Sequence, residues 1–161
     1  MKAVGLTGSR RGVTLIEMLI VMALIGLLVT VSFPAVSAGV DSLRLSSAGD
    51  AVVSFLNAAL NRAERHQEVM EVTISKDENA ILLRSTEPGY ERKLEMPAGV
   101  TIVSVLPPLP QETGEPRRFM LYPGGTIPSF GVELSNRKGA GRIVRIDPVT
   151  GVPQVERVEV R

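Results

Sequence analysis

An acidic side chain, Glu17, stands at the start of a long apolar stretch, and its chemistry needs an explanation before that of any other residue. From Met18 to Val29 the chain carries no polar side chain. A carboxylate in such surroundings is costly unless a cation pairs with it. Glu17 therefore has two interpretations. It pairs with a positive group of another chain, or it lies near the border of an apolar layer and reaches water.

Few other residues could carry out chemistry. The chain has one histidine, His66, and no cysteine, which excludes disulfides, thiolate metal sites and cysteine nucleophiles. Asp77-Glu78-Asn79 could offer oxygen ligands to calcium, but it lacks the spaced ligands of a dedicated loop, so a hairpin turn is favoured. Pro123-Gly124-Gly125 has no lysine beside it and predicts a turn rather than a phosphate loop. We expect no catalytic residue, metal or cofactor; a signal-anchored periplasmic enzyme is the alternative from another class.

The apolar stretch Val13–Phe33 is long enough to cross a bilayer. Its 21 residues would rise roughly 30 Å as a helix, the thickness of the hydrocarbon layer. Lys2, Arg10 and Arg11 precede it, which places the N-terminus in the cytoplasm and sends the rest across. A cleavable secretory signal is the alternative, with Ala35-Val36-Ser37-Ala38 as its cleavage site, although such signals have apolar cores of about 7–15 residues.

The residues around Glu17 form a motif: Arg10-Arg11-Gly12-Val13-Thr14-Leu15-Ile16-Glu17, followed by the uninterrupted apolar run. This motif resembles the processing site of type IV pilins and type II secretion pseudopilins. The resemblance implies that residues 1–12 are a leader peptide, which a prepilin peptidase removes between Gly12 and Val13. The same enzyme would methylate the new N-terminus at Val13. Glu17 would then serve filament assembly, because it could pair with the N-terminal amine of a neighbouring subunit and set the register.

The helix is expected to continue to about His66. Pro34 stands where the family often has a helix-bending proline, and it predicts a kink rather than an end. Over residues 34–67 apolar side chains recur at three- and four-residue spacing, which predicts an amphipathic continuation that packs on a sheet. This stripe consists of Ala48, Val52, Phe55, Leu56, Ala59 and Ala63.

Eight short β-like runs follow the helix. They are Val69–Ser75, Ala80–Arg84, Tyr90–Met96, Val100–Leu106, Arg118–Tyr122, Phe130–Leu134, Arg142–Ile146 and Val155–Val160. The turn at residues 76–79 predicts one hairpin, and Pro97-Ala98-Gly99 predicts a second hairpin from the third and fourth runs. Residues 107–116 are rich in proline and predict a loop. A long helix followed by antiparallel strands predicts an α+β fold. The resemblance implies that this fold is pilin-like, with residues 68–161 as a periplasmic β domain.

Within the pilin-like proteins, the chain is similar to the H-type minor pseudopilins and to their type IV pilus relatives of the FimT kind. This resemblance rests on Phe119–Gly125, Phe130–Leu134 and Gly141–Ile146. It implies a minor subunit of a type II secretion pseudopilus, which helps to export folded proteins. The alternative is a minor pilin of a type IV pilus, with a role in pilus assembly or DNA uptake.

The resemblance also implies the partners and the location. The partners would be other pseudopilins, major and minor, the prepilin peptidase and methyltransferase, and an inner-membrane assembly platform. The chain would cross the inner membrane once, with its C-terminal domain in the periplasm. The formal net charge of +1 gives no reason to expect direct nucleic-acid binding.

Overall fold

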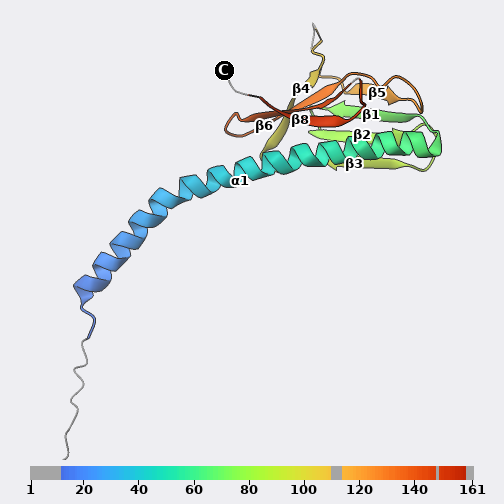
Figure 1. Ribbon diagram of the computed structural model, residues 1–161. Helices are drawn as coiled ribbons and strands as arrows, with labels where there is room; N and C mark the ends of the chain where they lie inside the picture. The colour runs from blue at the N-terminus through green and yellow to red at the C-terminus, as the bar shows by residue number, and fades with distance from the viewer. Residues whose placement is uncertain (1–11, 110–113, 148, 159–161) are drawn as a thin grey trace, which may run out of the picture. The chain divides into compact units, whose positions relative to one another are not determined.

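One long helix and eight strands make up the part of the chain that the structure describes (Figure 1). The structure, a computed structural model, describes residues 12–109, 114–147 and 149–158, so most of the expected leader, residues 1–11, lies outside it. The elements are α1 (Leu15–His66), β1 (Met70–Ser75), β2 (Ala80–Ser85), β3 (Glu91–Glu95), β4 (Val100–Leu106), β5 (Arg117–Leu121), β6 (Gly131–Asn136), β7 (Gly141–Ile146) and β8 (Pro153–Val158). All eight predicted strands are present; the end of the last run, at Val160, lies outside the described residues.

The end of α1 is defined by its last turn. Gln67 takes a positive φ of 56°, a left-handed conformation that stops a helix. Its side-chain amide donates to the Glu64 carbonyl at 2.7 Å, which satisfies one of the carbonyl groups left free at a helix C-terminus. Arg65 and His66 stand in the same turn, where positive charge is favoured by the helix dipole.

The second half of α1 packs on the strands through the predicted stripe. Leu56, Val52 and Ala59 have no exposed surface, and the other predicted members are buried too. Several members are alanines, so the helix backbone approaches the strands closely. The strands complete one apolar core, whose larger fully buried members are Met70, Ile74, Ile81, Leu83, Leu121, Phe130, Leu134 and Ile146.

The strands form two antiparallel four-stranded sheets. One has the order β3-β2-β1-β5 and the other has the order β4-β6-β7-β8. Phe119 of β5 stacks on Phe130, just before β6, with 4.2 Å between ring centroids, and so links the two sheets. Helix and sheets share one core, and the α+β, pilin-like fold is confirmed.

The predicted second hairpin is wrong. β3 pairs with β2, whereas β4 pairs with β6 in the other sheet, so residues 97–99 carry the chain between sheets. The reason lies in Asn79, in the turn before β2. Its side chain donates to the Val100 carbonyl and accepts from the Ile102 N–H, each at 2.8 Å. These bonds hold β4 against the β1–β2 turn, in a place where β3 does not pair with it.

Candidate functional site

The predicted cleavage site lies in an extended segment immediately before α1. Gly12 and Val13 have no helical or strand conformation and both are exposed, Val13 with 66% of its surface free. A Cβ added to Gly12 would meet no atom within 4 Å. The described part of the chain therefore gives no steric reason for a glycine here, and a need for glycine would come from an enzyme that holds this segment.

Thr14 and Glu17 organise the first turn of the helix. The Glu17 N–H donates to the Thr14 hydroxyl at 3.3 Å and to the Thr14 carbonyl at 3.1 Å. Thr14 thus acts as the N-cap of α1, which begins at Leu15. This role of Thr14 was not predicted, although a threonine three residues before a glutamate is the pattern of a capping box.

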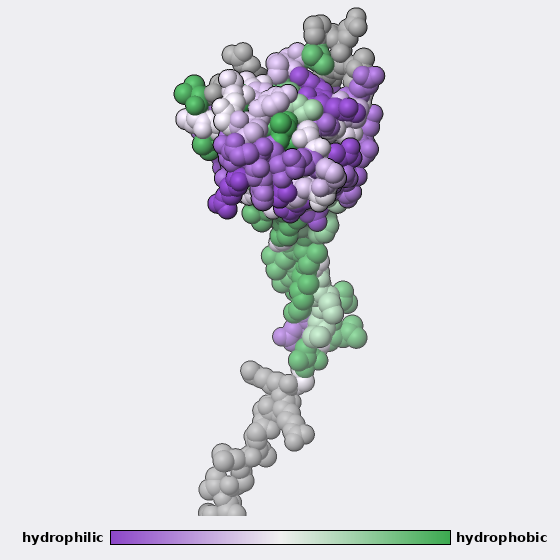
Figure 2. All heavy atoms as spheres, turned by 90° about the vertical axis from the view of Figure 1, so that its right-hand side faces the viewer, coloured by the Kyte–Doolittle hydropathy of each residue, from purple (hydrophilic) through white to green (hydrophobic). Residues whose placement is uncertain are grey.

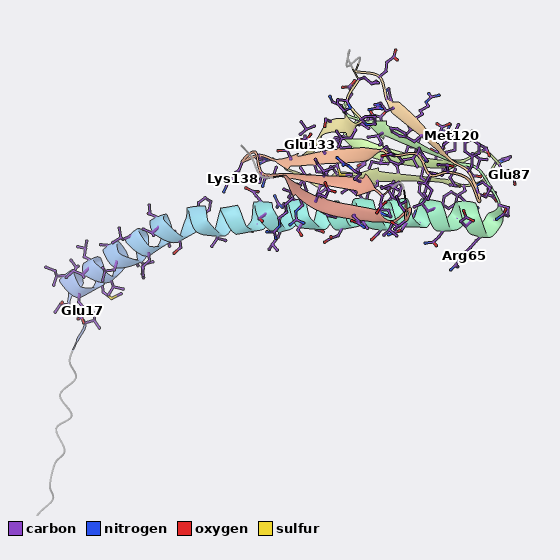
Figure 3. All side chains as sticks on the ribbon, turned by 45° about the horizontal axis from the view of Figure 1, so that its top comes forward. Glu17, Arg65, Glu87, Met120, Glu133 and Lys138 are labelled. Atoms are coloured by element: carbon purple, nitrogen blue, oxygen red, sulfur yellow. The ribbon has the colours of Figure 1, made fainter. Side chains whose placement is uncertain are left out.

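The carboxylate of Glu17 stands at a helix N-terminus, where negative charge is favoured by the helix dipole. Among the described residues it forms no ion pair within 4.0 Å. Figure 3 shows it beside the extended segment that carries Gly12 and Val13. Glu17 follows Val13, the predicted new N-terminus, by four residues, so the two residues lie near each other.

The first half of α1 is apolar and uncovered. Leu15–Phe33 is a stretch of 19 residues, none of them buried, that is long and apolar enough to cross a membrane. Figure 2 shows this part of the helix as hydrophobic, whereas the face of the β domain (β1–β8) seen in that view is largely hydrophilic. The Thr30 hydroxyl donates to the Gly26 carbonyl at 2.8 Å, so this polar group is satisfied within the helix.

The helix continues through Pro34 without interruption. This agrees with the expectation that the proline does not end the helix. The kink expected at Pro34 stays a prediction, as do the cut after Gly12, the methylation of Val13 and the role of Glu17 in assembly.

The remaining candidates take part in turns and caps. Asp77, Glu78 and Asn79 form the predicted turn between β1 and β2, and Glu78 pairs with Lys93 at 3.1 Å. His66 is exposed at the end of α1. In the described ranges no three residues of the types His, Cys, Asp and Glu are grouped as metal ligands would be.

Pro123-Gly124-Gly125 forms a turn after β5, as predicted. Gly124 has a φ of +61°, which favours glycine. Its N–H donates to Glu64 Oε1 at 2.8 Å and ties the turn to the last turns of α1. No sequence signal could have shown this contact, because the two residues are 60 positions apart.

A second polar cluster fixes the end of α1 to the β2–β3 hairpin. The Arg62 guanidinium lies 3.9 Å from the centroid of the Tyr90 ring and 3.5 Å from the Glu68 carboxylate. The Ser85 hydroxyl donates to the same carboxylate at 2.9 Å. The cluster has the cation–π and ion-pair geometry of a structural contact. It was not found from the sequence.

Comparisons with known proteins bear on the N-terminal segment. The family model described as the prokaryotic N-terminal methylation motif matches residues 8–33. Searches of curated proteins and of solved structures gave no match. The matched range contains the Gly12–Val13 bond, Glu17 and the apolar half of α1. A type IV pilin-like prepilin signal is therefore present, and it supports a type IV pilin-like protein that is processed by prepilin peptidase and assembles with other pilin-like subunits.

Proposed function

We propose that this protein is a minor pseudopilin of the H type, a subunit of a type II secretion pseudopilus that helps to export folded proteins. In this proposal the chain crosses the inner membrane once and its β domain lies in the periplasm. It is not an enzyme; it is the substrate of one, at the Gly12–Val13 bond. The observation that carries the proposal is the methylation motif, which ends in a fully uncovered apolar helix.

The uncovered half of α1 supports assembly through helix contacts. Each apolar side chain removed from water contributes about 1.5–3 kcal/mol, so the exposed side chains of Leu15–Phe33 must be covered by lipid or by other helices. Gly26 has open space where a Cβ would stand, which leaves room for close approach of a second helix. A membrane before assembly and a bundle of pilin-like helices afterwards would cover the same residues in turn.

Glu17 supports a defined register in that bundle. Its carboxylate has no ion pair among the described residues, and the Val13 amine created by cleavage would be its natural counter-ion in a neighbouring subunit. Methylation of an amine keeps its positive charge. A pair between unlike charges in an apolar bundle is favoured in one axial register only, because a shift leaves both charges unpaired.

The assignment to the H type rests on the resemblance in the second half of the chain. Those segments form the end of β5 with its Pro123-Gly124-Gly125 turn, the strand β6 and the strand β7. The absence of cysteine and tryptophan from the sequence argues against pilins with a C-terminal disulfide loop and against major pseudopilins with an Asp-Pro-Trp-Gly stretch.

The processing step is tested by mass spectrometry of the mature protein from its own cells. The expected N-terminus is an N-methylated Val13. Gly12→Leu should abolish the cut, and Gly26→Leu is the matched control, because an added Cβ would meet no atom within 4 Å at either glycine. An N-terminus near Ala38 would show that the segment is an ordinary secretory signal.

The role of Glu17 is tested by incorporation into filaments. Glu17→Ala and Glu17→Gln should both insert into the membrane but fail to assemble, because both remove the charge. Glutamine serves at this position of a capping box, so a variant Glu17→Gln that assembles normally would assign Glu17 to helix capping instead.

The secretion role is tested by deleting the gene and complementing it with the full chain. Loss of exported folded proteins from the medium, with pili unchanged, is the expected result. Loss of pili or of DNA uptake with secretion intact would favour the FimT-like alternative.

A further inference from the structure

Each sheet of the β domain has two edge strands, which are β3 and β5 in one sheet and β4 and β8 in the other. The backbone N–H and C=O groups on the outer side of an edge strand can pair with a strand of another chain. Proteins commonly block such edges with charges, prolines, bulges or covering groups. The four edges of this domain differ in how they are blocked.

The edge of β4 is closed by side chains from the other sheet. Asn79 bonds to the Val100 carbonyl and to the Ile102 N–H, and Arg117 Nη1 donates to the Val105 carbonyl at 2.6 Å. The register with β6 also shifts between Ile102 and Ser104, the sign of a bulge in this strand. β4 is therefore unavailable to another strand.

The edges of β3 and β8 carry charge or proline. β3 has the sequence Glu-Arg-Lys-Leu-Glu, and Lys93 lies 3.1 Å from Glu78 and 3.3 Å from Glu95. The Lys93 ammonium donates hydrogen bonds to Glu78 and Glu95, which raise the pKa of Lys93, so the amine stays charged. β8 begins at Pro153, which has no N–H to donate, and continues through Glu156 and Arg157.

β5 carries charge only at its start, at Arg117 and Arg118, and has neither a proline nor a register shift. The Thr86 N–H donates to the Val69 carbonyl across β1 and β2, so Val69 faces β2 and the next residue, Met70, faces β5. The direction of the backbone groups alternates along each antiparallel strand. Met70 pairs with Leu121 in the β1–β5 register, so the backbone groups of Leu121 face β1 and those of Met120 and Arg118 point away from it. No hydrogen bond within the described ranges satisfies them. β5 therefore offers two donors and two acceptors to a strand.

The side chains beside this edge define what kind of strand would bind. Arg118, Met120 and Tyr122 alternate with the core residue Leu121 and lie on the outer face of the sheet, where Figure 3 labels Met120. The Arg118 side chain is 70% exposed and forms a long ion pair with Glu71, with 3.9 Å between Arg118 Nε and Glu71 Oε1. Met120 and Tyr122 expose 37% and 56% of their surface. The row therefore presents one cation followed by two apolar side chains.

We propose that β5 is a docking edge for an extended strand of a different protein, which places a carboxylate opposite Arg118 and apolar side chains opposite Met120 and Tyr122. Backbone hydrogen bonds supply the binding and the alternating side chains supply the selectivity. A second copy of this chain is disfavoured, because pairing β5 with itself would bring two Arg118 side chains to the same short ladder. The proposal stands whether the wider assembly serves secretion or pili.

The test is photo-cross-linking of the full chain in its own cells, with p-benzoylphenylalanine in place of Tyr122. The cross-linked peptide of the partner is sequenced by tandem mass spectrometry. Met120→Pro removes the outward N–H, and Arg118→Glu reverses the charge. Arg157→Pro is the matched control, since the alternation along β7 and β8 places the Arg157 N–H on the outer side of the edge β8. Thermal unfolding of each variant shows whether the fold is retained.

The expected result is one partner segment with alternating apolar residues and a carboxylate. Its cross-link should fall about tenfold or more in Met120→Pro, since the partner's acceptor is left without a donor. It should fall similarly in Arg118→Glu, recover when the partner's acid is changed to lysine, and persist in Arg157→Pro. If Met120→Pro does not fold, Arg118→Glu decides. The proposal is overturned by a cross-link that both variants keep, by a partner segment without a carboxylate, by a second copy of this chain, or by no cross-linked chain.

Discussion

The two halves of α1 are one continuous helix by backbone conformation, yet they depend on different surroundings. In the first half, Leu15–Phe33, every residue is exposed; in the second half, a stripe from Leu45 to Ala63 is buried against the strands. The chain itself stabilises the second half through its core. Among the described residues none of the first half is buried, so its apolar side chains call for lipid or other helices. A helix can thus carry a folded domain on one part and an external contact surface on the other.

The largest expected effect is on the free energy of unfolding, which should depend on the second half of α1 and not on the first. Leu56→Ala removes a side chain with no exposed surface and should lower the free energy of unfolding of the β domain by about 2–5 kcal/mol. Leu24→Ala, at a leucine that is 55% exposed, should leave it unchanged. Chemical unfolding of the full chain in detergent measures both. Equal losses in the two variants would mean that the halves are coupled through the fold.

A second prediction concerns the hydrogen bonds between the two sheets on which the second half of α1 packs. Asn79→Ala removes two hydrogen bonds to β4, from a residue with a positive φ of 50°, and should cost about 2–4 kcal/mol. Amide hydrogen exchange should then increase at Ile102, whose N–H loses its acceptor, before it increases in β1. Asn79→Asp keeps the oxygen acceptor and should cost less. Unchanged exchange in β4 would show that the sheets are held together elsewhere.

A third prediction concerns the last turns of α1. Glu64→Ala removes the acceptor of the Gly124 N–H at an exposed site and should cost about 1 kcal/mol. Thermal unfolding measures the loss, and Glu64→Gln should recover part of it. An effect as large as that of Leu56→Ala would place more of the stability in this contact than in the stripe.

The smallest effect should arise at the β7–β8 turn, away from the helix. The N–H groups of Val149 and Thr150 donate to Asp147 and hold the pKa of its carboxyl below the ordinary value of 3.8. Because the folded-state pKa is lowered, this contribution is present above that value and is lost as the pH falls through the folded pKa. Unfolding curves between about pH 5 and pH 2 should lose this dependence in Asp147→Asn.

Much of the fold could be predicted because its signals are local. The helix stripe follows from three- and four-residue spacing, and each strand follows from a short run bounded by turn residues. The prediction of a second hairpin failed because Pro97-Ala98-Gly99 has the composition of a tight turn. The pairing of β4 is decided instead by Asn79 and by the distant strand β6. A local sequence pattern does not indicate which distant strand will be the pairing partner.

The candidate site shows the same division. Gly12, Val13 and Glu17 stand in a motif that the sequence displays directly, and the structure adds that they are exposed and that Thr14 caps the helix beside them. The contact between Glu64 and Gly124, and the Arg62 cluster, depend on how α1 meets the strands. No spacing in the sequence could reveal them.

Among the residues whose burial the structure describes, Leu45 is the first buried one along the chain. The N-terminal unit, Met1–Ala38, could therefore be exchanged for another segment. A gene fragment beginning at Gly39 encodes every core residue that the structure describes, so it should yield a soluble domain suited to crystallisation. Joined to the first 38 residues of another pilin-like chain, the same domain could be carried into a different filament without redesign of its interior.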